Sequence, residues 1–138
     1  MKFFTIGYGG RNPEEFTSML SEKGIVAIAD VRLHPNRASM GIYVRAKSSD
    51  KGIQRLLSSA NIEYHSLPEL GNQFLEHEDW QQRYKNYLST DGDRIISGLL
   101  ELPRPFCLLC AEKRASECHR KLIADLLESR GWEVEHIE

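Results

Sequence analysis

The sequence predicts a single-domain α/β fold, a three-layer sandwich with a mostly parallel sheet of about five strands and helices on both faces. Short β-rich runs alternate with helical stretches along the chain, which is typical of strand–helix–strand units. The length of 138 residues matches the commonest size of one domain. No repeat or change in composition marks a boundary, so we expect residues 1–138 to form one α/β domain.

Five short apolar runs predict the strands. The second run is almost wholly apolar, as expected for a strand covered on both faces. Pro103 and Pro105 separate the fourth run from the helix before it. In chain order, the strands are predicted over residues 3–8, 25–31, 62–66, 106–111 and 132–137. The order of the strands within the sheet does not follow from this pattern.

Capping residues and apolar residues at helical spacing predict the helices. Asn12, Pro13 and Glu15 are typical of a helix start, and Gly24 ends that first helix. Ser116 is expected to cap the last helix, so that Cys118 and His119 fall in its first turn. The helices in between are predicted over about residues 50–60, 74–88 and 91–102, and the last one ends at Gly131.

The composition excludes several classes of protein. With 41% hydrophobic and 28% charged residues, the chain is not collagen-like or globally disordered. No apolar run approaches the ~20 residues of a membrane helix, and the N-terminus is not typical of a signal peptide, so we expect no membrane partner. The three cysteines are an odd number, which favours reduced thiols and a cytoplasmic location. The net charge of −2 still allows a local basic patch.

Polar and reactive residues follow the carboxyl ends of the predicted strands, whereas the strand beginnings carry few. Ligands bind beyond the carboxyl ends in parallel sheets, so we expect a pocket there. The candidates are, for substrate binding, Tyr8, Gly9, Gly10, Arg11, Arg32 and Arg120, and, for catalysis, Asp30, His65, Glu69, Glu112, Cys118 and His119.

The first strand runs into a glycine-rich turn and then a capped helix. Free backbone N–H groups and the helix dipole make such a turn favourable for an anion. Its Gly7-Tyr8-Gly9 start is similar to the dinucleotide-binding fingerprint, but Asn12 stands where the third glycine belongs. A tight turn without a ligand is the alternative.

Asp30 and Arg32 lie two residues apart at the end of the second strand, so their side chains share a face if the strand continues. A buried acid is costly without a partner, and we expect the two to pair and Arg32 to hold a substrate anion. An ion pair without a ligand is the alternative.

A long loop predicted over residues 34–49 leads into a helix start, and together they carry a cluster of cations. The basic residues are Arg37, Arg45, Lys47 and Lys51. Such a segment over the ligand edge of the sheet can clamp the phosphate of a nucleotide or polynucleotide. A solvated loop is the alternative.

The cysteines carry the sharpest chemistry. A thiolate is favoured where a thiol lies in the first turn of a helix, which is where Cys118 is expected. Cys118 is then a nucleophile with His119 or His65 as its base, or Cys110, Cys118 and His119 form a metal site. The spacing is diagnostic of neither, and buried apolar cysteines are the alternative, above all for Cys107.

The same strand ends carry a family resemblance over nearly the whole chain. The motifs are Thr5-Ile6-Gly7-Tyr8-Gly9, Asp30-Val31-Arg32 with Pro35, Tyr64-His65 with Pro68-Glu69-Leu70-Gly71, and Leu109-Cys110-Ala111-Glu112 with Cys118-His119-Arg120. The sequence resembles the family catalogued as domain of unknown function 488. It departs from the family pattern at Asn72, where glycine is often repeated, and in its less regular basic loop. The resemblance supports the fold and the site and implies no particular reaction.

These observations favour an enzyme whose pocket takes a phosphate-bearing substrate, such as a nucleotide or nucleic acid. Arginines hold the anion, Cys118 is the nucleophile or a metal ligand, and Glu112, Glu69 or Asp30 orients the base. The alternative is a non-catalytic module that binds nucleic acid or an anionic small molecule through the same basic residues. A metal-stabilised structural domain ranks last. No particular cofactor is indicated.

Overall fold

The computed structural model describes residues 1–38 and 40–138; residue 39, inside the loop predicted over residues 34–49, lies outside the described residues. The described residues form a five-stranded sheet in the order β3-β2-β4-β1-β5, with every neighbouring pair parallel. The strands are β1 (Lys2–Gly7), β2 (Ala27–Asp30), β3 (Glu63–Ser66), β4 (Phe106–Cys110) and β5 (Glu133–Ile137). All five predicted strands are confirmed.

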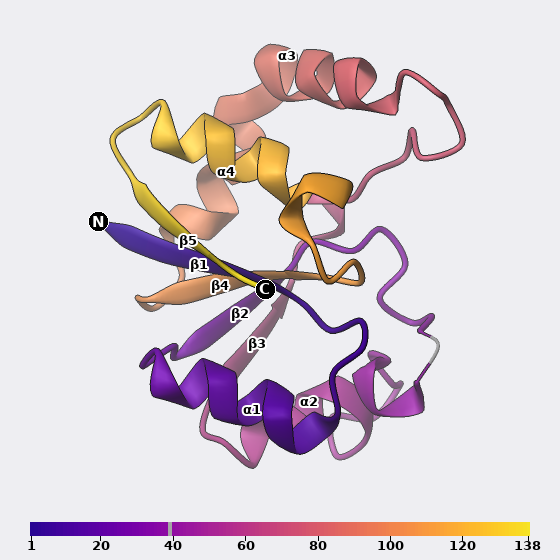
Figure 1. The fold of residues 1–138 in the computed structure, drawn as a ribbon, viewed down its shortest axis with the longest axis vertical. Helices are drawn as coiled ribbons and strands as arrows, with labels where there is room; N and C mark the ends of the chain where they lie inside the picture. The colour runs from indigo at the N-terminus through magenta and orange to yellow at the C-terminus, as the bar shows by residue number, and fades with distance from the viewer. Residues whose placement is uncertain (39) are drawn as a thin grey trace.

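Helices cover both faces of the sheet (Figure 1), which confirms the predicted three-layer arrangement. Helices α1 (Pro13–Glu22) and α2 (Gly52–Ser58) lie on one face, and α3 (Trp80–Leu100) and α4 (Arg120–Glu128) lie on the other. Three short 3₁₀ turns connect them, η1 (Gly41–Tyr43), η2 (Pro68–Leu70) and η3 (Ala115–Glu117). None of the helices among residues 1–38 and 40–138 is long and apolar enough to cross a membrane.

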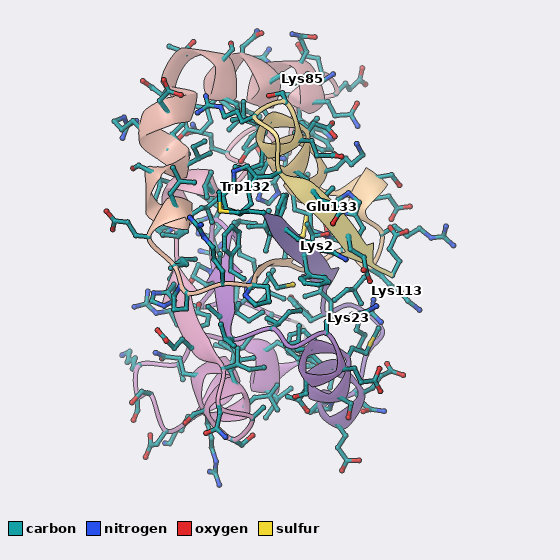
Figure 2. The ribbon with its side chains drawn as sticks, turned by 90° about the vertical axis from the view of Figure 1, so that its left-hand side faces the viewer. Lys2, Lys23, Lys85, Lys113, Trp132 and Glu133 are labelled. Atoms are coloured by element: carbon teal, nitrogen blue, oxygen red, sulfur yellow. A yellow bond between two sulfur atoms is a disulfide. The ribbon has the colours of Figure 1, made fainter. Side chains whose placement is uncertain are left out.

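Alternation along β1 divides the core into two layers. Phe3 packs with the apolar residues of α3 and α4, while Phe4 and Ile6 pack with those of α1 and α2. This is the two-residue period of a strand buried on both faces. In Figure 2, Lys2 and Glu133 mark the start of the β1–β5 pair, and Lys113 lies beyond its carboxyl end.

The helix before β4 differs from the prediction. Two helices were expected over residues 74–88 and 91–102, but α3 begins only at Trp80 and continues through a kink at Asp91 (φ −121°, ψ 15°). The side chain of Asn72 accepts a hydrogen bond from the N–H of Phe74. This local bond competes with a helix start, and the segment before Trp80 remains outside the helix.

The last helix also begins later than expected. Ser116 lies inside η3 rather than at a helix cap, Cys118 is extended (φ −133°, ψ 149°), and His119 is the N-cap residue of α4. The N–H of Ala115 donates to the carboxylate of Glu138, 23 residues away. Because this partner is distant in sequence, the local capping pattern could not reveal the turn.

The strand order creates a crevice at the carboxyl edge of the sheet. β2 and β4 are neighbours, yet the chain leaves β2 toward the α1–α2 face and leaves β4 toward the α3–α4 face. Ligands bind in α/β sheets where adjacent connections diverge in this way. The fold therefore places the expected pocket between the ends of β2 and β4.

Gly7, the last residue of β1, packs directly against the backbone of the chain after β4. A Cβ atom at Gly7 would overlap the carbonyl group of Glu112. We predict that Gly7→Ala lowers the free energy of unfolding by about 2 kcal/mol or more, because backbone has to shift. Urea unfolding measures it. Gly41→Ala, whose Cβ would meet nothing within 4 Å, is the matched control, and an equal loss in both variants would contradict the prediction.

Candidate functional site

A pocket of about 510 Å³ opens at this crevice. Its walls come from the segments that follow β2 and β4 and from the segment that leads into α3. The residues that line it are Arg32, Leu33, His34, Arg37, Asn72, Gln73, Leu75, Glu76, Trp80, Cys110, Ala111, Glu112, Glu117, Cys118 and His119. The pocket thus lies at the strand ends where the sequence places its reactive residues.

Two sulfur atoms and an imidazole meet at one wall of the pocket. The sulfurs of Cys110 and Cys118 are joined as a disulfide, and Cys107 is a free, buried thiol. The expectation of reduced thiols was therefore wrong for Cys110 and Cys118 in this structure. Nδ1 of His119 lies 3.5 Å from Sγ of Cys118, and its Nε2 lies 2.7 Å from the carbonyl oxygen of Val31. A carbonyl only accepts, so Nε2 carries the proton and Nδ1 presents a lone pair to Cys118.

The imidazole of His119 is held uncharged. Burial lowers its pKa to about 4, helped by the nearby charge of Arg120 and opposed by the hydrogen bond to Val31. At neutral pH the ring is therefore uncharged, and the lone pair of Nδ1 faces Cys118. In enzymes with a cysteine nucleophile, a general base lies next to the thiol, and a third group orients that base.

Arg120 organises the loop that carries these groups. Its guanidinium is fully buried and donates to Sγ of Cys110 at 2.9 Å. It also donates to the carbonyl oxygens of Glu112 and Lys113, at 2.6 and 3.0 Å, and to the hydroxyl of Thr5 at 3.2 Å. With these partners, Arg120 supports the pocket wall from behind and is not among the residues that line the pocket.

The expected pair of Asp30 and Arg32 is confirmed. Nε and Nη2 of Arg32 donate to the two carboxylate oxygens of Asp30, at 2.8 and 2.7 Å, and Nη1 donates to the carbonyl oxygen of Tyr43. The hydroxyl of Tyr64 also donates to Asp30, and burial together with the Asp30 charge raises the Tyr64 pKa. Arg32 lines the pocket, whereas Asp30 is fully buried behind it.

The glycine-rich turn does not reach the pocket. The N–H of Gly9 donates to the carbonyl of Ala111, Gly10 lies beside the stem of Lys113, and Tyr8 stacks on Tyr43. The turn therefore closes against the chain after β4, which corresponds to the tight-turn alternative.

Three further candidates also lie elsewhere. Arg11 is buried and donates to the carbonyl oxygens of Gly7, Ile137 and Glu138. His65 is half-buried and pairs with Glu63, and Glu69 is exposed on η2. None of the three lines the pocket, so His119, and not His65, is the histidine beside Cys118.

The metal alternative finds no support in the arrangement of side chains. Within the part of the chain that the structure describes, no group of three or more His, Cys, Asp or Glu residues is placed to hold a metal ion. Cys110, Cys118 and His119 lie close together, but the lone pair of Nδ1 faces Cys118 while Nε2 faces a carbonyl.

Sequence reasoning missed the wall of the pocket that leads into α3. Asn72, Gln73, Glu76 and Trp80 line it, and none of these four residues is among the candidates that the sequence analysis names. The departure from the family pattern at Asn72 was the available signal. His34, which is not among the sequence-based candidates, also lines the pocket, and the length of the loop predicted over residues 34–49 was the signal there.

Burial of neutral His119 makes stability depend on pH. The unfolded chain binds a proton at the ordinary pKa of 6.5, whereas the folded protein binds it only near 4. The contribution is fully present above pH 6.5 and is lost as the pH falls through this window, on the order of 3 kcal/mol in total. We predict that His119→Gln flattens this loss, as measured by urea unfolding at several pH values.

The control for this prediction is a second histidine, which is half-buried. His136 also has a lowered pKa because of burial, and it keeps its contribution in both proteins, so the difference between wild type and His119→Gln isolates His119. An NMR titration showing His119 protonated near pH 6.5 in the folded protein would contradict the prediction.

The chain matches the model of one protein family over residues 12–127, from the start of α1 to the end of α4. The match includes every segment that lines the pocket. No curated protein and no solved structure matches the chain. The resemblance noted in the motifs is confirmed: the chain belongs to the family described as Domain of unknown function DUF488.

Proposed function

We propose that the protein is an enzyme whose pocket at the strand ends acts on a phosphate-bearing substrate, with Cys118 as nucleophile and His119 as proton acceptor. The observation that carries this proposal is the alignment of Cys118 Sγ, His119 Nδ1 and, behind the ring, the carbonyl of Val31. Nucleophile, base and orienting group thus follow one another in contact. These three roles require Cys118 in its reduced form, as a thiol that is not joined to Cys110.

The covalent step follows from these contacts. The Cys118 thiol gives its proton to Nδ1 of His119 while Sγ bonds to the electrophilic atom of the substrate. The leaving group departs with the bonding electron pair and takes the proton from Nδ1. Water then attacks the same atom and gives its proton to Nδ1, and Sγ leaves and recovers that proton, so the enzyme returns unchanged.

The charges around the pocket support an anionic substrate with a second, polar part. Arg37 is exposed at the rim and has no ion-pair partner among the described residues, so it is available for a phosphate. Trp80 offers an aromatic surface and Asn72 offers an amide, which suit the stacking and hydrogen bonding of a nucleobase. Glu112 and Glu117, on the wall formed by the segment after β4, favour hydrogen-bond donor groups on the substrate.

A cytoplasmic location is part of the same proposal. The pair of Cys110 and Cys118 lies in the pocket beside His119 and Arg120, as a reactive pair does, and Cys107 stays a free thiol. Reactive thiols of this kind work in reducing compartments.

A second candidate function is nucleic-acid binding without catalysis. It is favoured by the exposed cations Arg37, Arg45, Lys47 and Lys51, which form no ion pair within the described residues. Phosphate contacts of this kind release counterions.

This candidate makes its own prediction. Double charge reversal at Arg45 and Lys47 should weaken binding of a single-stranded oligonucleotide by about tenfold or more and reduce its salt dependence. Fluorescence anisotropy at several salt concentrations measures both. Charge reversal at Lys85, on α3, is the control. Unchanged affinity in the Arg45 and Lys47 variant would dispose of this candidate.

The enzyme proposal predicts the reactivity of the reduced thiols. Iodoacetamide should label Cys118 about 100-fold faster than Cys107 at neutral pH, because burial raises the pKa of the Cys107 thiol and His119 can accept the Cys118 proton. His119→Gln should slow Cys118 labelling about tenfold. Mass spectrometry of the peptides separates the sites.

The same labelling experiment with a ligand present tests the expected phosphate-bearing substrate. Adenosine monophosphate should protect Cys118 from labelling, and Arg37→Glu should abolish that protection while leaving the rate without ligand unchanged. Equal, slow labelling of Cys118 and Cys107 would sink the thiol mechanism, whereas fast labelling without protection would overturn only the phosphate-bearing substrate.

A further inference from the structure

The guanidinium of Arg120 forms no ion pair with a carboxylate among the described residues. Its side chain is fully buried. Buried guanidinium groups are normally paired, because an isolated buried charge is costly. Apart from Sγ of Cys110, its partners are two carbonyls and a hydroxyl.

Cys110 is therefore the one hydrogen-bonded partner of Arg120 that can supply a negative charge. As a thiolate it would form with Arg120 the ion pair that the burial of the guanidinium demands. Cys107 does not serve, because burial raises its pKa and keeps it a neutral thiol. In the reduced protein, Arg120 would therefore stabilise a thiolate at Cys110, while Nδ1 of His119 faces Cys118.

The two sulfurs meet in the pocket wall. They are joined in this structure, and both cysteines line the pocket. They are separated by only eight positions in the chain, so one short loop after β4 carries both sulfurs.

We propose that Cys118 and Cys110 form a dithiol–disulfide centre that reduces small disulfides by thiol–disulfide exchange. Cys118 is the attacking thiol, with His119 as its base, and Cys110 is the resolving thiol, with Arg120 as its counter-ion. This activity goes beyond the proposed function but rests on the same nucleophile, Cys118.

The exchange balances in two steps. Cys118 gives its proton to Nδ1 of His119, and its sulfur attacks a sulfur of the substrate disulfide, whose bond breaks. A mixed disulfide forms, and the first substrate thiolate leaves with the proton from Nδ1. The Cys110 thiolate then attacks Sγ of Cys118, and the second substrate thiolate leaves and is protonated by water. The dithiol has lost two electrons, and the substrate has become two thiols.

The pocket limits the substrate class. Cys110 and Cys118 are 2% and 6% exposed and are reached through a pocket of about 510 Å³, which excludes a folded protein as the disulfide donor. Arg37 on one wall and Glu112 and Glu117 on another match a small disulfide that carries both carboxylate and ammonium groups. Glutathione disulfide is a probe of this kind, and hydroxyethyl disulfide is its uncharged counterpart.

The decisive experiment traps the mixed disulfide. Cys110→Ser, reduced and then exposed to glutathione disulfide, should hold one glutathione on Cys118, as mass spectrometry of the intact chain and its peptides shows. The wild type should instead link Cys110 to Cys118 and release two glutathione thiols. Cys107→Ser, the matched control, should behave as the wild type does. With dithiothreitol as reductant, turnover in Cys110→Ser should fall at least about tenfold.

A second readout does not depend on the folding of Cys110→Ser. The Arg120→Lys variant, with all three cysteines present, keeps the positive charge but loses the forked set of N–H donors. This variant should close the Cys110–Cys118 disulfide more slowly than the wild type, with the largest difference at low pH. Turnover with glutathione disulfide should also exceed that with hydroxyethyl disulfide.

The outcomes separate this inference from the proposed function. Wild-type protein that retains glutathione on Cys118 without closing the disulfide, or that does not react while iodoacetamide still labels Cys118 rapidly, overturns the redox centre and leaves the nucleophile intact. Slow labelling of Cys118 together with no exchange overturns both. Rapid exchange without protection by adenosine monophosphate supports the redox centre and removes the phosphate-bearing substrate.

Discussion

The buried guanidinium of Arg120 is the interaction on which the site depends. From the start of α4 it reaches Thr5 on β1, the sulfur of Cys110 at the end of β4 and two carbonyls of the following loop. One side chain thereby joins two central strands, a helix and the loop between them. Because its charge must be satisfied away from water, the loop can adopt few other arrangements.

The end of β2 supplies the second support. The carbonyl of Val31, one residue beyond the strand, orients the ring of His119, and Asp30 holds Arg32 through both of its carboxylate oxygens. These groups sit on a rigid parallel sheet, while the residues that would touch a substrate lie on the loops. A rigid sheet with adaptable loops is the usual division of work in α/β enzymes.

The arginines show what local sequence could not reveal. Arg11, Arg32 and Arg120 all follow strand ends, and each was expected to hold a substrate anion. Only Arg32 lines the pocket. Arg11 and Arg120 are buried elsewhere, each with one hydrogen-bond partner more than 100 residues away in the chain, at Ile137 and Thr5 respectively. The sequence alone does not distinguish an arginine that hydrogen-bonds to distant backbone or hydroxyl groups from one that is free to bind an anion.

The sequence by itself determined the five strands, the two-sided sandwich, the pairing of Asp30 with Arg32 and the edge that carries the pocket, because periodicity and two-residue spacing are local properties. Only the tertiary structure decided the strand order, the late start of α4 and the meeting of Cys110 with Cys118 and Arg120. It also determined that the segment leading into α3, with Trp80, forms one wall of the pocket. These features depend on contacts between residues distant in the chain, which no local pattern encodes.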